Sequence, residues 1–352
     1  MTVDLDDGPA VRGHDPGGML AVIGELGSHC REGYSNGAGA SGLPDLADVR
    51  GVVCCGMGGS AVAGDVLRSV FRDRLGVPVE VNRSPELPEY AGPHTLVVIS
   101  SYSGNTSETL AASREATKRG CRSIVVTSGG TIADEATEAG VPVVSVPGGF
   151  QPRAAVGWLA FTALGALEAA GLLPPLADDV AEAAGEVDAR AAASGLDAPA
   201  GDDPAKRLAE AIGERIPVLW GAEGIGVAAA ARWKTQFNEN GKVPAWWASM
   251  SELDHNEVVG WTRPFGRSHA VIALRHEAED PEIAARFPLS LEIAADAGAD
   301  THEVWATGRS ALARLMSLIA LGDFVSAYVA IRKGVDPTPV DVIQRLKAAL
   351  AS

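Results

Sequence analysis

Hydrophobic and polar positions along the chain follow one plan twice. Residues 49–71, VRGVVCCGMGGSAVAGDVLRSVF, begin as a buried apolar strand, pass through a turn of small residues and end as an amphipathic helix. Residues 215–237, RIPVLWGAEGIGVAAAARWKTQF, repeat this order in the second half, with Gly221 where the first copy has Gly56. The pattern therefore indicates an internal duplication.

Further strands and a long closing helix complete each half. The second strands are predicted within residues 95–110 and 269–284, the third strands within 121–130 and 300–309, and the closing apolar helices within 153–171 and 312–334. Strands that alternate with helices form βαβ units with parallel strands and right-handed crossovers. The sequence therefore predicts an α/β protein with two domains, each a parallel β-sheet flanked by helices.

The segment between the halves predicts where the domains divide. Residues 176–206 are rich in Ala, Asp and Gly, which favours an acidic helix followed by a loose linker. We expect a mobile N-terminal tail over residues 1–20, a first, phosphate-binding domain over 21–195, a linker over 196–206, and a second domain with a C-terminal helix over 207–352.

Composition and charge narrow the class of protein. A chain of 352 residues with 46% hydrophobic and 21% charged positions is globular rather than disordered. The net charge of −16 argues against a nucleic-acid partner, which would require a basic face. Arg314 and Asp323 interrupt the most apolar run, and the N-terminus is acidic, so neither a membrane span nor a signal peptide is expected. The four cysteines fit no disulfide framework and no CxxC pattern, which favours a reducing, cytoplasmic location.

Two loops rich in hydroxyl groups follow consecutive strands of the first half. They are GMGGSA (56–61) and SYSGNTSET (101–109). Ligands of open parallel sheets bind at the carboxyl ends of strands, and hydroxyls with free N–H groups at a helix start bind a dianionic phosphate. The same residue types are common in ordinary polar turns and helix caps, but two such loops in succession favour the phosphate interpretation. The nucleotide-binding patterns GxxxxGK[ST] and GxGxxG are missing, and the acidic loop at 275–282 of the second half would repel phosphate, so we expect one site per chain.

The second half carries a different candidate within residues 231–261. Glu239 lies near the end of a predicted helix, and His255 follows after an aromatic turn. A carboxylate and an imidazole can act as a general acid/base pair in a sheltered cleft. On spacing alone, a solvated helix end for Glu239 and a helix-cap neighbour for His255 are the commoner interpretations. A metal site of His255 with the neighbouring glutamates is not favoured, because HxH or HExxH spacing is missing.

Two lysines near the C-terminus are further candidates. Lys333 and Lys347 lie within residues 332–352, and Lys347 belongs to a predicted helix whose apolar positions would pack on the body of the protein. A packed tail can bring one lysine into a cleft, although a surface lysine is the commoner outcome.

Four segments together resemble the bifunctional phosphoglucose/phosphomannose isomerases of the sugar isomerase (SIS) superfamily. They are GMGGSAVAGD (56–65), SYSGNTSET (101–109), PGGFQPRAA (147–155) and NENGKVPAWWASMSELDHNEVVGW (238–261). The first two alone indicate only an SIS domain, whereas the segment ending ELDHNE is specific to this subfamily. The resemblance extends from about residue 20 to residue 350 and implies two SIS-type, flavodoxin-like domains.

The resemblance also implies roles for individual residues. The residues that would hold the sugar phosphate are Gly59, Ser60, Ser101, Ser103 and Thr106. Glu239 corresponds to the base that moves a proton between C2 and C1, and His255 to the residue that assists ring opening. Lys347 corresponds to a lysine with a related role, and Arg153 to an arginine that stabilises the enediolate. The resemblance implies no metal or cofactor. It does imply a homodimer with the active site at the interface.

We therefore expect a cytoplasmic, metal-independent aldose–ketose isomerase. Its substrates would be glucose 6-phosphate and mannose 6-phosphate, each interconverted with fructose 6-phosphate through an enediol(ate). Two alternatives stay open: a non-catalytic SIS protein that binds sugar phosphates, and an SIS isomerase of another sugar phosphate or amino-sugar phosphate.

Overall fold

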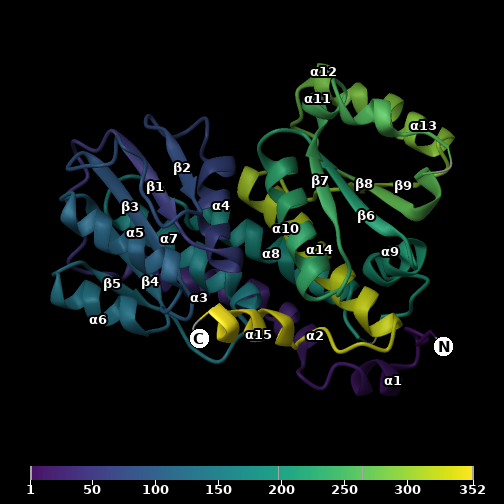
Figure 1. Cartoon of the computed structure of the whole chain (residues 1–352), viewed down its shortest axis with the longest axis horizontal. Helices are drawn as coiled ribbons and strands as arrows, with labels where there is room; N and C mark the ends of the chain where they lie inside the picture. The colour runs from purple at the N-terminus through teal and green to yellow at the C-terminus, as the bar shows by residue number, and fades with distance from the viewer. Residues whose placement is uncertain (1, 197, 264, 351–352) are drawn as a thin grey trace. The chain divides into compact units, whose positions relative to one another are not determined.

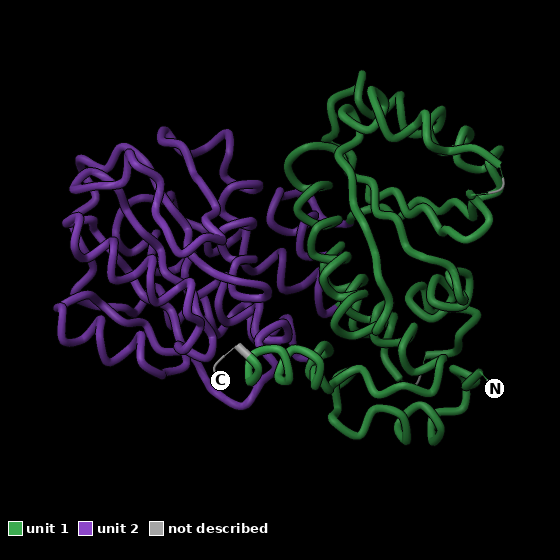
Figure 2. The backbone as a smooth tube through the Cα atoms, viewed as in Figure 1, with its two compact units in different colours: residues 1–24, 189–306, 318–352 green, residues 25–188, 307–317 purple. Residues whose placement is uncertain are grey.

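The chain folds into two compact units. The computed structural model describes residues 2–196, 198–263 and 265–350 (Figure 1). Unit 2 is built from residues 25–188 and 307–317, and unit 1 from the other described residues (Figure 2).

The units differ from the expected division at the boundary, which falls after residue 188 rather than after 195, and in two further places. The residues before Glu25 belong to unit 1, where α1 (Gly8–Gly13) and α2 (Met19–Gly24) form and the Val3 amide donates to the Arg332 carbonyl over 2.8 Å. Residues 307–317, expected in the second domain, belong to unit 2. Both differences arise from pairing between distant parts of the chain, which composition does not reveal.

Unit 2 is a five-stranded parallel sheet in the order β2-β1-β3-β4-β5. Its elements are α3 (Leu26–Ala38), β1 (Gly51–Cys55), the 3₁₀ helix η1 (Gly58–Ala61), α4 (Val62–Val70), β2 (Val79–Asn82), β3 (Thr95–Ser101), α5 (Ser107–Lys118), β4 (Arg122–Thr127), α6 (Thr131–Glu138), β5 (Val143–Ser145), the 3₁₀ helix η2 (Pro152–Ala155) and α7 (Val156–Ala169). Every residue of β1 and β3 is buried, as their apolar sequences predict. The strand order changes direction between β1 and β3, and ligands of such sheets bind at that point.

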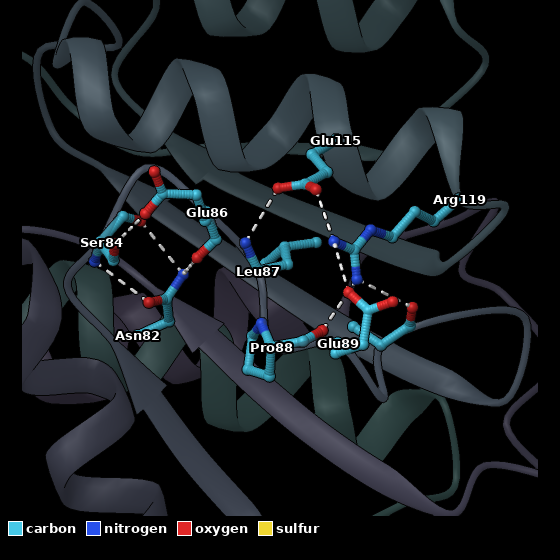
Figure 3. A network of polar contacts seen from close by, with 9 residues as sticks. Asn82, Ser84, Glu86, Leu87, Pro88, Glu89, Glu115 and Arg119 are labelled. Atoms are coloured by element: carbon cyan, nitrogen blue, oxygen red, sulfur yellow. Dashed lines mark hydrogen bonds and ion pairs between the residues drawn. The ribbon is translucent and has the colours of Figure 1, made fainter.

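Helix α5 is fixed to the sheet at its C-terminal end by the connection between β2 and β3. Glu115 accepts a hydrogen bond of 2.9 Å from the Leu87 amide, and Arg119 donates one of 2.8 Å to the Pro88 carbonyl (Figure 3). The side-chain amide of Asn82 donates to the Glu86 carbonyl at the start of the same connection. These bonds hold the helix whose N-terminus follows the second hydroxyl-rich loop.

Unit 1 contains a four-stranded parallel sheet in the order β7-β6-β8-β9. Its elements after α2 are α9 (Pro204–Ile212), β6 (Ile216–Gly221), α10 (Ile225–Glu239), β7 (Trp246–Ser249), α11 (Met250–Leu253), the 3₁₀ helices η3 (Glu257–Gly260) and η4 (Phe265–Ser268), β8 (His269–Arg275), α12 (Pro281–Ala284), α13 (Arg286–Asp296), β9 (Asp300–Trp305) and α15 (Asp341–Leu350). The prediction of two parallel sheets flanked by helices is confirmed. The prediction of an aromatic turn around Trp246 is wrong, because Trp246 and Trp247 belong to the edge strand β7, which pairs with β6.

Two helices contribute residues to both units. They are α8 (Ala177–Ala193) and α14 (Ala311–Arg332). Among the described residues, α14 is the one helix long and apolar enough to cross a membrane, and 94% of its apolar window is buried inside the structure. Asp323 is a charged residue within its apolar sequence. It forms a buried ion pair with Arg232, with 2.7 Å between Nη2 of Arg232 and Oδ2 of Asp323. Burial on this scale is typical of a core helix.

Candidate functional site

The carboxyl edge of the unit 2 sheet gathers the residues expected to hold phosphate. Gly59 and Ser60 lie in η1, which follows β1. Ser101 ends β3, and Ser103 and Thr106 lie between β3 and α5. Both loops therefore flank the point where the strand order changes direction.

Arg153 lies beside the first of these loops. A Cβ atom built on Gly59 would be only 2.8 Å from the Arg153 Cα and 2.8 Å from the Pro152 carbonyl oxygen, so the two backbones are in direct contact. Arg153 itself is 1% exposed. The structure thus places a buried cation next to the glycine-rich loop.

The hydroxyl groups of the two loops have different surroundings. The Ser60 hydroxyl accepts a hydrogen bond of 3.0 Å from the Tyr102 amide, and the buried Ser101 hydroxyl makes no hydrogen bond to any described residue. Ser103 is exposed, and half-buried Thr106 precedes α5 without its side chain capping any described N–H group of that helix. Ser103 and Thr106 therefore offer accessible hydroxyls at a helix N-terminus, where the dipole favours an anion.

Asn105 is a residue of this loop that the sequence analysis did not single out. Its side-chain oxygen accepts hydrogen bonds of 3.0 Å from both the amide and the hydroxyl of Thr131, at the start of α6. Gly104 has φ of +66°, and a Cβ there would be 1.7 Å from the Gly129 carbonyl oxygen. The loop is therefore held tightly against the connection between β4 and α6.

Glu239 lies in unit 1, at the last residue of α10, and is half-buried. It lines a pocket of about 690 Å³ together with residues 335–336 and 339–343, which belong to the segment before α15 and to its first turn. The Lys242 ammonium donates to the carbonyls of Glu239, Pro337 (2.8 Å) and Pro339 (2.5 Å). This lysine, which sequence reasoning missed, ties the end of α10 to the segment that precedes α15.

Unit 1 does not bring Glu239 and His255 together. Helix α10 starts at the carboxyl edge of the sheet, after β6, and returns to the amino edge, where Glu239 ends it. Strand β7 then crosses the sheet again and leads to α11 at the carboxyl edge (Figure 1). Exposed His255 follows α11 in the chain and therefore lies at that edge. An acid/base pair of these two side chains within one chain, which the spacing left open, is therefore not formed.

The two candidate lysines differ in their surroundings. Lys333 lies 3.6 Å from a Glu214 carboxylate oxygen, with its side chain 20% exposed. Lys347 is exposed on α15, in the last turn. Ile343 and Leu346 of this helix are 40% and 60% exposed, so their expected packing on the body of the protein is not observed, and the side chain of Leu350 lies outside the described residues.

A metal site was not expected from the sequence. Within the described ranges, no group of three or more His, Cys, Asp or Glu side chains is placed to hold a metal ion. That the reaction needs no metal stays a prediction.

Two family models match the chain. A model described as "SIS domain" matches residues 45–143, and one described as "Bacterial phospho-glucose isomerase C-terminal SIS domain" matches residues 201–350. The first contains both hydroxyl-rich loops, and the second contains Glu239, His255 and Lys347.

Similar proteins cover nearly the whole chain. A bifunctional phosphoglucose/phosphomannose isomerase from Caldicellulosiruptor bescii is 36% identical over 95% of this chain and 99% of its own length. One from Thermoplasma acidophilum is 34% identical over 85% of this chain and 89% of its own length. A solved structure of a hypothetical protein from Thermus thermophilus has the same fold, with a TM-score of 0.77 at 18% identity, over 97% of this chain and 93% of that chain.

Proposed function

Because this chain belongs to the family of bifunctional phosphoglucose/phosphomannose isomerases, we propose that it interconverts glucose 6-phosphate and mannose 6-phosphate with fructose 6-phosphate. The observation that carries the proposal is the match over 99% of a curated relative. It is supported by accessible hydroxyls at the N-terminus of α5 and by a buried arginine beside the other, glycine-rich loop. The relatives that match both halves of the chain are named as isomerases, which favours an enzyme over a non-catalytic binding protein.

The phosphate is bound by the hydroxyl-rich loops of unit 2. Ser103 and Thr106 donate from their hydroxyls, and the first turn of α5 adds N–H groups and the positive end of its dipole. Gly59 allows the η1 loop to approach closely, since it has no side chain between the loop and Arg153. Ser60 and Ser101 are buried, so they shape the loops more than they reach solvent.

Glu239 is the base that moves the proton between C2 and C1. Aldose–ketose isomerisation passes through a planar enediol(ate), and one carboxylate can serve both C2 epimers because they share this intermediate. Arg153 supplies positive charge for the developing oxyanion in a water-excluded position. No step in this scheme requires a metal, so activity should survive exhaustive chelation.

His255 assists ring opening from a second copy of the chain. It lies at the opposite sheet edge from Glu239 within unit 1, which supports a homodimer in which one copy supplies Glu239 and the other His255. Lys347 is favoured over Lys333 as the lysine near the reacting sugar, because Lys333 is paired with Glu214 while the segment before α15 lines the Glu239 pocket. We place this isomerase in the cytoplasm.

The test is a coupled assay with each hexose 6-phosphate, with and without a chelator, on wild type and Glu239→Gln. The substitution keeps the size of the side chain but removes the basic oxygen, so kcat should fall by about 10²–10⁴ for both epimers. The control is Glu223→Gln, which should retain wild-type kcat. Glu223 is an exposed carboxylate shortly before the first residue of α10, whereas Glu239 is the last residue of that helix.

Solvent deuterium uptake at C2 separates the roles. If Glu239→Gln exchanges this proton at the wild-type rate, Glu239 is not the base. If the wild type turns over neither epimer but isomerises glucosamine 6-phosphate, the substrate is an amino sugar, and if it only binds these compounds, it is a binding protein.

A further inference from the structure

Tyr102 is an aromatic residue in the middle of the hydroxyl-rich loop, between Ser101 and Ser103. It is 6% exposed, whereas Ser103 beside it is exposed. Nothing in the motif requires an aromatic ring for binding phosphate. Its side chain therefore serves another purpose.

The phenol hydroxyl of Tyr102 bridges two backbone groups of the segment after β5. It donates to the Pro147 carbonyl over 2.9 Å and accepts from the Phe150 amide over 2.9 Å. Burial raises the pKa of Tyr102, so the hydroxyl stays protonated and able to donate at neutral pH. The bridged segment leads directly into η2 and Arg153.

The backbone of Tyr102 joins the other loops of the same edge. Its amide donates to the Ser60 hydroxyl (3.0 Å), after β1, and its carbonyl accepts from the amide (3.1 Å) and hydroxyl (2.6 Å) of Ser128, after β4. Tyr102, which lies in the connection after β3, thus contacts the connections that follow β1, β4 and β5. Tyr102→Phe leaves these backbone groups in place, so the bridge to residues 147–150 is what the phenol hydroxyl adds.

The bridged segment is exposed and rich in glycine. Pro147, Gly148 and Gly149 are exposed, and Gly149 has φ of +98°. The Phe150 ring packs edge-on against His29, with 4.9 Å between ring centroids. The hydroxyl bridge is therefore a polar contact that fixes this segment relative to the phosphate loop.

We propose that Tyr102 is a positioning residue that holds Arg153 in register with the phosphate-binding loop. This proposal rests on the proposed function, because it assigns Tyr102 to the step in which Arg153 stabilises the enediolate. Displacement of a catalytic group by about 1 Å costs up to about 10²-fold in rate. Loss of the bridge should therefore slow the chemical step while leaving phosphate binding in place.

The experiment compares Tyr102→Phe with wild type in the full-length protein. The variant keeps the buried ring and removes only the hydroxyl. We expect kcat to fall about 10- to 100-fold for both epimers, while the inhibition constant of inorganic phosphate changes less than about 2-fold. Ser103→Ala/Thr106→Ala should do the opposite and weaken phosphate inhibition. Tyr34→Phe, which loses a hydroxyl bond to Glu168 elsewhere in unit 2, should retain wild-type kcat.

Two further measurements decide between positioning and general stability. If Tyr102 acts through Arg153, the double variant Tyr102→Phe/Arg153→Lys should be no slower than Arg153→Lys alone. Hydrogen exchange at the Phe150 amide should accelerate in Tyr102→Phe, a readout that does not depend on activity.

Unchanged kcat in Tyr102→Phe would overturn the proposal, whether or not exchange at Phe150 accelerates. So would additive rate losses, or a parallel loss of kcat, phosphate binding and melting temperature. If wild type shows no isomerase activity but exchange at Phe150 still accelerates, the proposed function fails while the hydroxyl bridge stands as a structural contact.

Discussion

The backbone of Gly59 lies against that of Arg153 too closely for any side chain. A methyl group there would meet the Arg153 Cα and the Pro152 carbonyl at 2.8 Å, and neither is the flexible end of a side chain. The glycine therefore sets the distance between the phosphate loop and the arginine.

Gly59→Ala should push η1 and η2 apart. We expect a loss of about 1–3 kcal/mol in the free energy of unfolding, as for other overpacked sites, and a fall in kcat. Urea unfolding and steady-state kinetics measure the two effects. Gly76→Ala is the control, because a Cβ there meets nothing within 4 Å, and it should stay within about 0.5 kcal/mol of wild type. Equal effects of the two substitutions would contradict the close-contact argument.

The candidate residues could be predicted where short motifs carry them. Gly59, Ser103 and Thr106 belong to local patterns of small and hydroxyl side chains, and their placement follows from the strands before them. Tyr102 and Lys242 could not be found this way. Their partners, Pro147 and Pro339, are distant in sequence and are backbone carbonyls, which carry no residue signature.

Helix α14 shows how one element accommodates a charge in an apolar sequence. Asp323 and Arg232 have side chains that are 4% and 1% exposed, and two hydrogen bonds join them, of 2.7 and 3.2 Å. The pair allows α14 and α10 to pack without an uncompensated charge.

Asp323→Ala should destabilise the protein strongly, because it leaves a buried guanidinium without this carboxylate. The expected cost is about 3–5 kcal/mol, measured by urea unfolding. Replacing both partners, as Arg232→Met/Asp323→Leu, should recover most of it. Glu135→Ala, which breaks an exposed pair with Arg114, is the control and should cost at most about 1 kcal/mol. A cost below that control would show that the buried pair is not needed.

The start of α14 is capped by a carboxylate from another helix. Glu182 on α8 accepts hydrogen bonds from the amides of Arg309 (2.8 Å) and Ser310 (3.0 Å), just before the first residue of α14. These bonds lower the pKa of Glu182 from 4.5 to about 2.

The lowered pKa predicts a pH dependence of stability. A carboxyl whose folded pKa lies below its unfolded pKa stabilises the fold above the unfolded value of 4.5, and this contribution is lost as the pH falls towards 2. Glu182→Gln should therefore be less stable than wild type at pH 7, by up to about 3 kcal/mol, and equally stable near pH 2. Urea midpoints across this range, with Glu138→Gln as the control, test it. A constant gap between wild type and Glu182→Gln at all pH values would contradict it.

The elements that could be predicted are the ones whose own residues decide their structure. Strands β1 and β3 are continuous apolar runs and are buried throughout. Strands β2, β5 and β7 were missed because they are short edge strands with partly exposed residues. Trp246 and Trp247 were predicted to form a turn. Their strand conformation depends on pairing with β6, which their local sequence does not reveal.

At the scale of the whole molecule, we expect the protein to be active as a homodimer. If one copy supplies Glu239 and the other His255, mixing two inactive variants restores some sites. Glu239→Gln and His255→Ala, unfolded together and refolded, should regain up to about a quarter of wild-type activity, because half the dimers are hybrids and each has one intact site.

Refolding each variant alone is the control and should give no recovery. If the refolded mixture is as inactive as the separate variants while size-exclusion chromatography shows dimers, the two side chains act within one copy. The dimer itself is excluded if the wild type elutes as a monomer.

The two compact units are interleaved along the chain, and this affects how the protein is made. Translation delivers residues from the N-terminus, and domains that are contiguous in sequence fold as they emerge from the ribosome. Here residues 2–24 are made first, but the rest of their unit, residues 189–306 and 318–350, is made last. The core of unit 2 from Val53 to Ala136 lies wholly within residues 25–188, so it can pack while the N-terminal segment still waits for its partners. A product that ends near residue 188 would therefore keep a packed sheet, whereas its residues 2–24 would lack most of the unit to which they belong.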